Sequence, residues 1–435
     1  MNYAIEEYTF TVGILIAFIG TIIAVYGSRH SIYEVLRESG MNKRLLLLAI
    51  VMVLVFAGLE LAIVKPTQQL FFDDVIYQGM AQDLIHTGQA WMCNYGTPAK
   101  CFIGQTFHEP IGTAFTLGIA FLAFGVNASS AYGTGFFLAA VSVLFTFLIA
   151  LVLSKEPYVA VFSTLFMALS PILLVWAYPT TSDMPMLAYS LIAIFFMLVF
   201  SSRRNAWTFM LVLSSLALLA YMKIDAIAYV VLIPLLYIII SDNGIKDSIR
   251  KNAARLKNNA FNTPMLVALL IFVIAIAPEV GFAHYELQHG SYGYADTTVQ
   301  KSCSASPSFI TPSKPIDLQN LEANICGNIN FWLGAYNKTD IIQPFAFTAF
   351  AIVGIAFLAV YGYWRQALFL GIWFLAFFLL YTSFYAGGVL YGVDWRFMLS
   401  VITPVCIFGG YGVYGIIKSA DNFMYRWQKD GSAKR

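Results

Sequence analysis

Long apolar runs separated by short polar segments dominate the chain. Many of these runs approach the roughly 20 residues that cross a bilayer as a helix. The pattern predicts an all-α polytopic membrane protein with a bundle of about eleven transmembrane helices. The predicted spans are Thr9–Tyr26, Leu45–Val64, Tyr132–Leu153, Tyr158–Tyr178, Met184–Phe200, Trp207–Tyr221, Ala226–Ile240, Met265–Phe282, Phe345–Tyr361, Ala367–Tyr385 and Phe397–Ile417.

One further apolar run, Ile111–Val126, is not counted as a span. If it crossed the membrane, every later loop would change sides. The basic loops at Arg203-Arg204 and Lys246–Lys257 would then lie outside, against the positive-inside rule. We therefore expect a re-entrant or surface-lying helix at this position.

The distribution of charge orients the bundle. The basic segments Arg29–Arg44, Lys246–Lys257 and Lys418–Arg435 fall on one side of the predicted topology, which identifies that side as cytoplasmic. The N-terminus is then outside and the C-terminus inside, in a multi-pass protein of the cell (plasma) membrane. With 59% hydrophobic and only 11% charged residues, the composition excludes a soluble enzyme, and we expect no nucleic-acid partner.

Two long loops face the outside, at residues 65–131 and 283–344. In the first, Asp74–Thr87 has apolar residues at helical spacing and is followed by Gly88, a common helix terminator. This segment predicts a short amphipathic helix on the outer leaflet. The adjacent acids Asp73 and Asp74 lie at its N-terminal end, where the helix dipole favours negative charge. A simple N-terminal role for the two acids is one interpretation of the pair.

The cysteines agree with this topology. Cys93 and Cys101 share the first outer loop, and Cys303 and Cys326 share the second. Two pairs on an oxidising side suggest two disulfides, with free thiols as the alternative. Neither pair has the Cys-x-x-Cys spacing that zinc sites favour.

Ionisable residues gather at the outer ends of the predicted helices. Most of them lie in loops of only a few residues, so their charges stay close to the lipid boundary. Two cations beside several carboxylates suggest recognition of an anionic headgroup together with general-base chemistry. The alternative for each residue alone is a solvated loop charge. The group comprises Asp73, Asp74, His108, Glu109, Asp183, Lys223, Asp225, Asp394 and Arg396.

At these positions the chain resembles the GT-C superfamily of membrane glycosyltransferases, above all protein O-mannosyltransferases and lipid A aminoarabinose transferases. The matching features are an acid pair followed by a Tyr, a partial Pro-containing element, an outer Asp, a later Lys and an Arg-aromatic pair. In this sequence they are Asp73-Asp74 with Tyr77, Phe107-His108-Glu109-Pro110, Asp183, Lys223 and Arg396-Phe397. The element at 107–110 departs from the family pattern, because Glu109 stands where the first Pro is expected.

The resemblance divides the chain into two parts. Residues 1–44 form an extra N-terminal transmembrane helix with a basic cytoplasmic loop, and residues 45–435 form the GT-C-like module. The resemblance implies transfer of a sugar from a polyprenyl-phosphate donor to an acceptor, which is a protein, a lipid or a glycan, on the outer membrane face. In this scheme the chain's partners are the donor, the acceptor and membrane lipid.

The resemblance also implies roles for the gathered residues. Asp73 is the expected general base, and Asp74 is expected at the catalytic centre as its neighbour or as an acceptor-binding group. Lys223 and Arg396 bind the donor phosphate. The remaining candidates for substrate contact are Tyr77, His108, Glu109, Asp183 and Asp225. We expect no cofactor, and a divalent metal is not favoured.

A second function remains open at this point. A transporter or flippase of a lipid-linked or anionic substrate would also gather charges in a membrane bundle. Such a protein is expected to carry charged residues deep within its spans and to show internal repeats. Glu60, near the outer end of its apolar run, is the only strong candidate for a charged residue within a span. No internal repeat is evident.

Overall fold

The structure is a computed structural model. It describes residues 3–66, 71–92, 102–103, 110–241, 263–289, 297–299, 308–310, 325, 344–383 and 394–432.

The described part of the chain is almost entirely helical. The helices are α1 (Tyr3–Glu38), α2 (Lys43–Ile63), α3 (Phe71–Thr87), α4 (Ile111–Phe124), α5 (Ala128–Ser154), α6 (Pro157–Ala168), α7 (Pro171–Trp176), α8 (Asp183–Ser202), α9 (Ala206–Ala220), η2 (Ile224–Ile227), α10 (Ala228–Ile240), α12 (Thr263–His289), α14 (Phe345–Val360), α15 (Trp364–Ser383), η5 (Asp394–Met398) and α16 (Leu399–Ser432). Two small antiparallel pairs of strands complete it, β1 (Trp91–Met92) with β2 (Phe102–Ile103) and β3 (Thr297–Val299) with β4 (Ser308–Ile310).

The predicted fold class, an all-α membrane protein, is confirmed. Among the described helices, 7 are long and apolar enough to cross a membrane. Several shorter apolar helices, α4, α6, α9, α10 and α14, pack among them. The total of about eleven spans therefore stays a prediction.

Helices begin where the sequence supplies an N-cap. Asn42 accepts bonds from the backbone N–H groups of Arg44 and Leu45 and starts α2. Asn127 starts α5 in the same way, and Asn205 forms a capping box with Thr208 at the start of α9. These side chains satisfy backbone donors that a helix N-terminus leaves without a partner.

The predicted single span Tyr158–Tyr178 is wrong, because the structure divides it into α6 and α7. The break falls at Leu169 and Ser170, immediately before Pro171. A proline ring clashes with the helical conformation of the preceding residue and has no N–H to donate, so α6 ends and α7 starts afresh. The segment after α7 then turns inward and delivers residues 177–182 to the candidate site.

The first helix is also longer than the predicted span Thr9–Tyr26. α1 continues to Glu38, through residues that the sequence placed in a basic loop. Its far end is tied to the loop between α8 and α9, where Arg203 forms ion pairs with Glu34 and Glu38.

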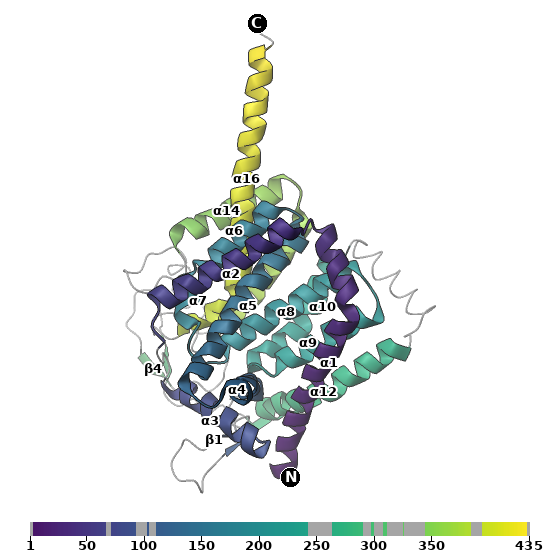
Figure 1. Cartoon of the computed structure of the whole chain (residues 1–435), viewed down its shortest axis with the longest axis vertical. Coiled ribbons are helices and arrows are strands. Elements are labelled where there is room, and N and C mark those ends of the chain that lie inside the picture. Colours follow the sequence, from purple (N-terminus) through teal and green to yellow (C-terminus); the bar gives the residue numbers. More distant parts are fainter. Residues whose placement is uncertain are drawn as a thin grey trace.

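The predicted helix in the first outer loop is present as α3, and Gly88 ends it with a positive φ of 77°. Its apolar face does not lie on lipid as expected. Ile76, Met80 and Leu84 are buried, and α3 packs against α4. The first half of α4 is buried as well, and Figure 1 shows this helix nearly end-on, crosswise to α1 and α2. That orientation supports a helix that does not span.

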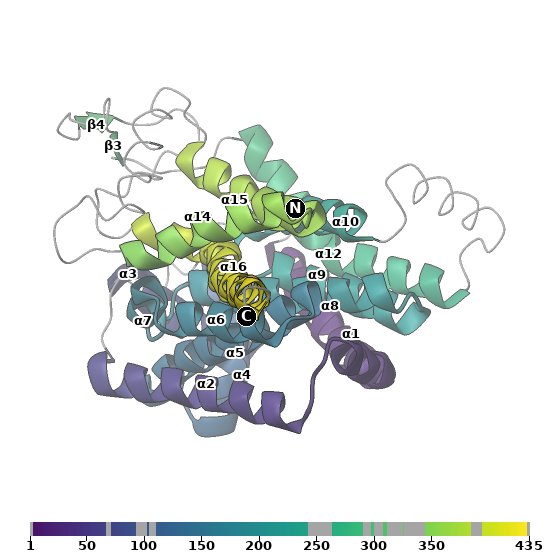
Figure 2. The same ribbon diagram turned by 90° about the horizontal axis from the view of Figure 1, so that it is seen from above.

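The termini lie at opposite ends of the molecule. In Figure 1 the N-terminus is at the end that carries α3 and α4, and α16 projects from the other end. Viewed from above in Figure 2, α16 is seen along its axis with α14 and α6 packed beside it. The three helices approach closely because glycines line the contact. A Cβ added at Gly354 would overlap the carbonyl of Phe408, and one added at Gly412 would overlap that of Phe350.

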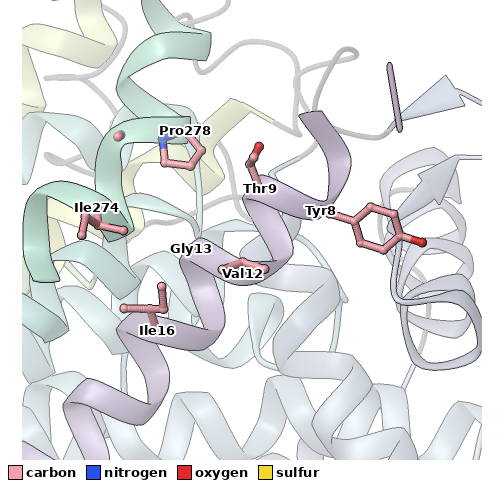
Figure 3. Close-up of a pocket in the computed structure, with 8 residues that line it drawn as sticks. Tyr8, Thr9, Val12, Gly13, Ile16, Ile274 and Pro278 are labelled. Atoms are coloured by element: carbon pink, nitrogen blue, oxygen red, sulfur yellow. The ribbon is translucent and has the colours of Figure 1, made fainter. Parts of the chain in front are cut away.

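An apolar groove of about 700 Å³ lies between the N-terminal part of α1 and the middle of α12. Figure 3 shows Val12, Gly13 and Ile16 on α1 facing Ile274 and Pro278 on α12. Just behind this groove, α1 and α12 both contact α9.

Candidate functional site

The two adjacent acids at the start of α3 have different partners. Asp74 is fully buried and accepts bonds from the backbone N–H and the hydroxyl of Thr180, the latter at 2.9 Å. Asp73 faces the other way, and its Oδ2 lies 2.7 Å from Nη1 of Arg396. Successive helical residues are rotated by about 100°, so the two side chains point in different directions. Asp74 therefore anchors the 177–182 segment, whereas Asp73 reaches Arg396.

Arg396 joins two carboxylates. It lies in η5, at the entry to α16, and its Nε is 3.5 Å from Oδ2 of Asp183 while its Nη1 contacts Asp73. Asp183 is in the first turn of α8. The guanidinium thus bridges α3 and α8, which are far apart in sequence.

Lys223 forms the second bridge. Its Nζ lies 2.9 Å from Oδ1 of Asp183 and 3.0 Å from Oδ2 of Asp225. Asp183 consequently contacts a cation on each side. The five residues form a continuous row in the order Asp73, Arg396, Asp183, Lys223, Asp225, which we call the charge row.

The charge row is buried at its centre and open at its ends. The side chain of Asp183 is 5% exposed, compared with 22% for Asp73 and 25% for Asp225. A small molecule can therefore reach the two outer carboxylates more easily than the central one. These two are also the groups that a competing anion could displace from their cations.

Aromatic rings cover the two cations. Nζ of Lys223 lies 4.3 Å from the ring centroid of Phe397, and Cζ of Arg396 lies 5.2 Å from the same ring. Trp176 and Tyr381 add further ring faces at 6.0 and 5.4 Å from Arg396 and Lys223, respectively. Ring faces attract cations and exclude water, which strengthens the electrostatic interactions inside the site.

Lys223 keeps its charge in this environment. Burial lowers the pKa of its ammonium group, but the carboxylates of Asp183 and Asp225 outweigh that effect and raise the pKa above its usual value. An ammonium has three N–H donors, and Lys223 uses two of them on described carboxylates. It can therefore offer a donor to an incoming anion.

The charge row can bind an anion and can accept a proton. With all groups ionised, three carboxylates face two cations, so an anion binds most strongly where a carboxylate gives up its cation. A phosphate taking the place of Asp73 on Arg396 would gain two directed N–H donors, which suits a guanidinium. The released carboxylate could then accept a proton from a nearby hydroxyl.

The structure brings together most, but not all, of the predicted site residues. Asp73, Asp183, Lys223, Asp225 and Arg396 meet in the charge row. Tyr77 is buried one helical turn after Asp73. His108, Glu109, Cys93, Cys101, Cys303 and Cys326 lie outside the described residues, as does the side chain of Asp394.

Neither the disulfides nor the metal requirement is decided. Among the cysteines in the described part of the chain, Cys406 is buried and is not in a disulfide. Within the described residues no group of three or more His, Cys, Asp or Glu is placed to hold a metal ion. A reaction without metal stays a prediction.

The sequence patterns did not predict three residues that contact the site. Thr180 holds Asp74, and Trp176 and Tyr381 cover the cations. The polar run 180–182 directly before Asp183 was a signal for the first of them, because hydroxyls so near a membrane span usually have a buried partner. No local signal marks the two aromatic residues in a chain with 16% aromatic residues.

The chain is similar to known proteins in sequence and in fold. Residues 108–280 match the sequence model of a family described as dolichyl-phosphate-mannose-protein mannosyltransferase. The matched segment includes Asp183 and Lys223. None of the curated proteins compared with the chain matches it significantly.

Solved structures share the fold. The structure of ArnT from Cupriavidus metallidurans in the apo state superposes with a TM-score of 0.53 at 13% identity, over 83% of this chain and 59% of ArnT. The same enzyme bound to undecaprenyl phosphate gives a TM-score of 0.50 at 13% identity, with the same shares covered. The archaeal oligosaccharyltransferase AglB from Archaeoglobus fulgidus, in complex with an inhibitory peptide and a dolichol-phosphate, gives 0.50 at 10% identity, over 89% of this chain and 52% of AglB.

The chain thus spans little more than half the length of the proteins that it resembles in structure. The resemblance expected from the sequence is confirmed, and the chain has the fold of the GT-C membrane glycosyltransferases.

Proposed function

We propose that the protein is a glycosyltransferase that moves a sugar from a polyprenyl-phosphate donor to an acceptor on the outer membrane face. The observation that carries this proposal is the charge row, in which two cations flank Asp183 and an accessible carboxylate stands at each end. Phosphate-binding cations beside a carboxylate base are the groups that such a transfer needs.

In the proposed reaction, an acceptor hydroxyl or amide attacks the anomeric carbon of the sugar. The bond between that carbon and the phosphate oxygen breaks, and its electron pair leaves with the polyprenyl phosphate. Asp73 takes the proton of the acceptor. Lys223 and Arg396 stabilise the negative charge that develops on the departing phosphate. Attack from the face opposite the phosphate inverts the anomeric configuration.

Arg396 links binding of the donor to release of the base. In the structure it is paired with Asp73. A donor phosphate that binds Arg396 competes with that pair and releases the carboxylate toward the acceptor. Donor binding would then prepare the base, and an acceptor arriving first would meet a carboxylate that is still held.

Two similar structures support a lipid-phosphate donor, since ArnT was solved with undecaprenyl phosphate and AglB with a dolichol-phosphate. The outer location rests on charge. The basic residues Arg29, Arg37, Lys43 and Arg44 lie around the turn between α1 and α2, at the end of α1 opposite the N-terminus and α3. By the positive-inside rule the charge row then faces outward.

The test is transfer of radiolabelled sugar from a panel of polyprenyl-phosphate sugars by the purified protein in lipid nanodiscs. Label should move to an acceptor, or be released to water, with the wild type. Asp73→Asn should abolish this turnover because an amide cannot accept the proton. Asp83→Asn is the matched control, since it neutralises an acid on the same helix away from the charge row.

Wild-type turnover by Asp73→Asn would sink the assignment of the base. Donor affinity separates the other roles. Lys223→Ala and Arg396→Ala should each weaken binding of the donor, whereas Arg203→Ala, at the opposite end of the bundle, should not. Unchanged donor affinity in both site variants would remove the phosphate site from the proposal.

A further inference from the structure

Lys223 is held in place by a short turn rather than by a helix. α9 ends at Ala220, and the chain passes through Tyr221 and Met222 before Lys223 opens η2. The backbone of Lys223 is extended, with φ −160° and ψ 150°. The direction of its side chain therefore depends on the positions of the two preceding residues, Tyr221 and Met222. Whatever fixes residues 221 and 222 also fixes the ammonium group in the charge row.

The first turn of α4 binds both carbonyls of this turn. The backbone N–H of Gly112 donates to the carbonyl of Tyr221 at 2.9 Å. The hydroxyl of Thr113 donates to the carbonyl of Met222 at 3.2 Å. The first N–H groups of a helix have no partner within it, so α4 offers donors that the turn can use. A Cβ at position 112 would overlap the Tyr221 carbonyl, which explains the glycine.

α12 and α1 hold the turn from its other side. The hydroxyl of Tyr221 donates to the carbonyl of Ala275 in α12 at 2.5 Å. α1 leaves room for this hydroxyl only because residue 13 is a glycine, since a Cβ there would overlap it. Figure 3 shows Gly13 at the point where α1 faces α12. Tyr221 and Met222 are fully buried, so no water replaces these bonds.

We propose that Thr113 is a positioning residue for the donor-phosphate site, acting through the Met222 carbonyl on Lys223. This inference rests on the proposed function, because it assumes that Lys223 binds the phosphate. Within the described part of the chain the Thr113 hydroxyl bonds to the Met222 carbonyl and not to the charge row, and the residue is 1% exposed. Thr113→Val keeps the shape of the side chain and removes the hydroxyl, which releases the bond between α4 and the Met222 carbonyl.

The experiment measures binding of undecaprenyl phosphate and of dolichyl phosphate to the full-length protein in nanodiscs. Thr113→Val should weaken binding of the preferred lipid about three- to tenfold, the effect of one buried hydrogen bond. Thr113→Ser should restore wild-type affinity because it restores the hydroxyl. Thr146→Val is the matched control. Thr146 is equally buried, but its hydroxyl bonds only within α5, to the carbonyl of Ser142.

A double-mutant cycle separates positioning from general loosening. If Thr113 acts through Lys223, adding Thr113→Val to Lys223→Ala should cause no further loss of affinity. Losses that multiply would mean that Thr113 acts on the fold, and would overturn the inference. Should Thr113→Val fold poorly, Thr113→Ala supplies the same comparison with a smaller side chain.

The outcomes also distinguish a failure of the positioning role of Thr113 from a failure of the proposed phosphate site. A wild type that binds neither lipid phosphate, or a Lys223→Ala variant that binds as well as the wild type, overturns the phosphate site and the inference with it. Loss of binding in Lys223→Ala with wild-type affinity in Thr113→Val overturns the positioning role alone.

Discussion

Two neighbouring aspartates illustrate how the surroundings of a residue determine its role. Asp73 and Asp74 are chemically identical and adjacent in sequence, yet one pairs with Arg396 and the other holds the backbone of Thr180. Asp73 is partly exposed and Asp74 is fully buried. We infer that Asp73 serves the reaction and that Asp74 serves the fold around it.

These different roles predict that a substitution of Asp74 lowers stability, whereas a substitution of Asp73 removes activity. Asp74→Ala should lower the free energy of unfolding by about 1–3 kcal/mol, because the buried N–H of Thr180 loses its acceptor. Asp73→Asn should leave stability almost unchanged and remove activity. The measurement is the apparent melting temperature of the purified protein in detergent, beside the transfer assay. The division is wrong if Asp73→Asn melts earlier than Asp74→Ala.

Arg396 allows a test of geometry against charge. It contacts Asp73 through Nη1 and Asp183 through Nε, and a lysine keeps the charge without this fork. Arg396→Lys should reduce turnover at least about tenfold, since hydrogen bonds between charged groups contribute about 1.5–3 kcal/mol.

The control for this variant is Arg29→Lys, which makes the same exchange at an exposed position in α1. It should leave turnover at the wild-type level. Full activity of Arg396→Lys would show that a point charge suffices at this position, and would argue against the bridging role.

At the level of helices, α1 docks on α9 through residues spaced by seven. Gly13, Gly20 and Gly27 of α1 each face α9, opposite Tyr221, Ser214 and Trp207, respectively. The spacing of seven on both helices keeps the contacts on one face, and the opposite order shows that the helices are antiparallel. Small residues at such positions allow membrane helices to approach closely.

The three positions do not tolerate a Cβ equally. At Gly27 it would overlap the indole ring of Trp207, whereas at Gly20 it would lie 3.4 Å from Cβ of Ser214, an ordinary contact. Gly27→Ala should therefore lower the free energy of unfolding by about 1–3 kcal/mol. Gly20→Ala should be neutral or slightly stabilising, because alanine favours a helix more than glycine does.

Thermal unfolding of the two variants in the same detergent provides the comparison. Equal melting temperatures for Gly20→Ala and Gly27→Ala would contradict the docking of α1 described above. The comparison tests the docking of α1 alone, since both glycines belong to this helix.

For the whole molecule, the arrangement of the ends predicts sidedness. The N-terminus and α3 share one end, and the turn of residues 39–42 and the C-terminal part of α16 lie toward the other. An N-terminal epitope tag should be cleaved by protease added to intact cells. A tag inserted at Gly40, a turn position with open space around it, should be cleaved only after the membrane is opened. The reverse pattern would place the charge row on the cytoplasmic face.

Sequence patterns by themselves determined most of the helices. Hydrophobicity and helix capping act over a few turns, so most apolar runs became helices whose ends lie near the predicted ones. Even the break at Pro171 has a local cause, although the run of apolar residues concealed it. The residues of the charge row were also recognisable, because charges in short loops at a membrane boundary are costly and seldom without a role.

The tertiary structure alone decided how these residues combine. Asp73 and Arg396 are 323 positions apart, and Asp183 and Lys223 are 40 apart. No local pattern reveals which of many charges will lie within 3 Å of each other. The same holds for Thr113 in α4, whose bond partner Met222 lies 109 residues further along the chain. Helix formation depends on neighbours along the chain, whereas ion pairs and hydrogen bonds between helices depend on distances that only the packed bundle sets.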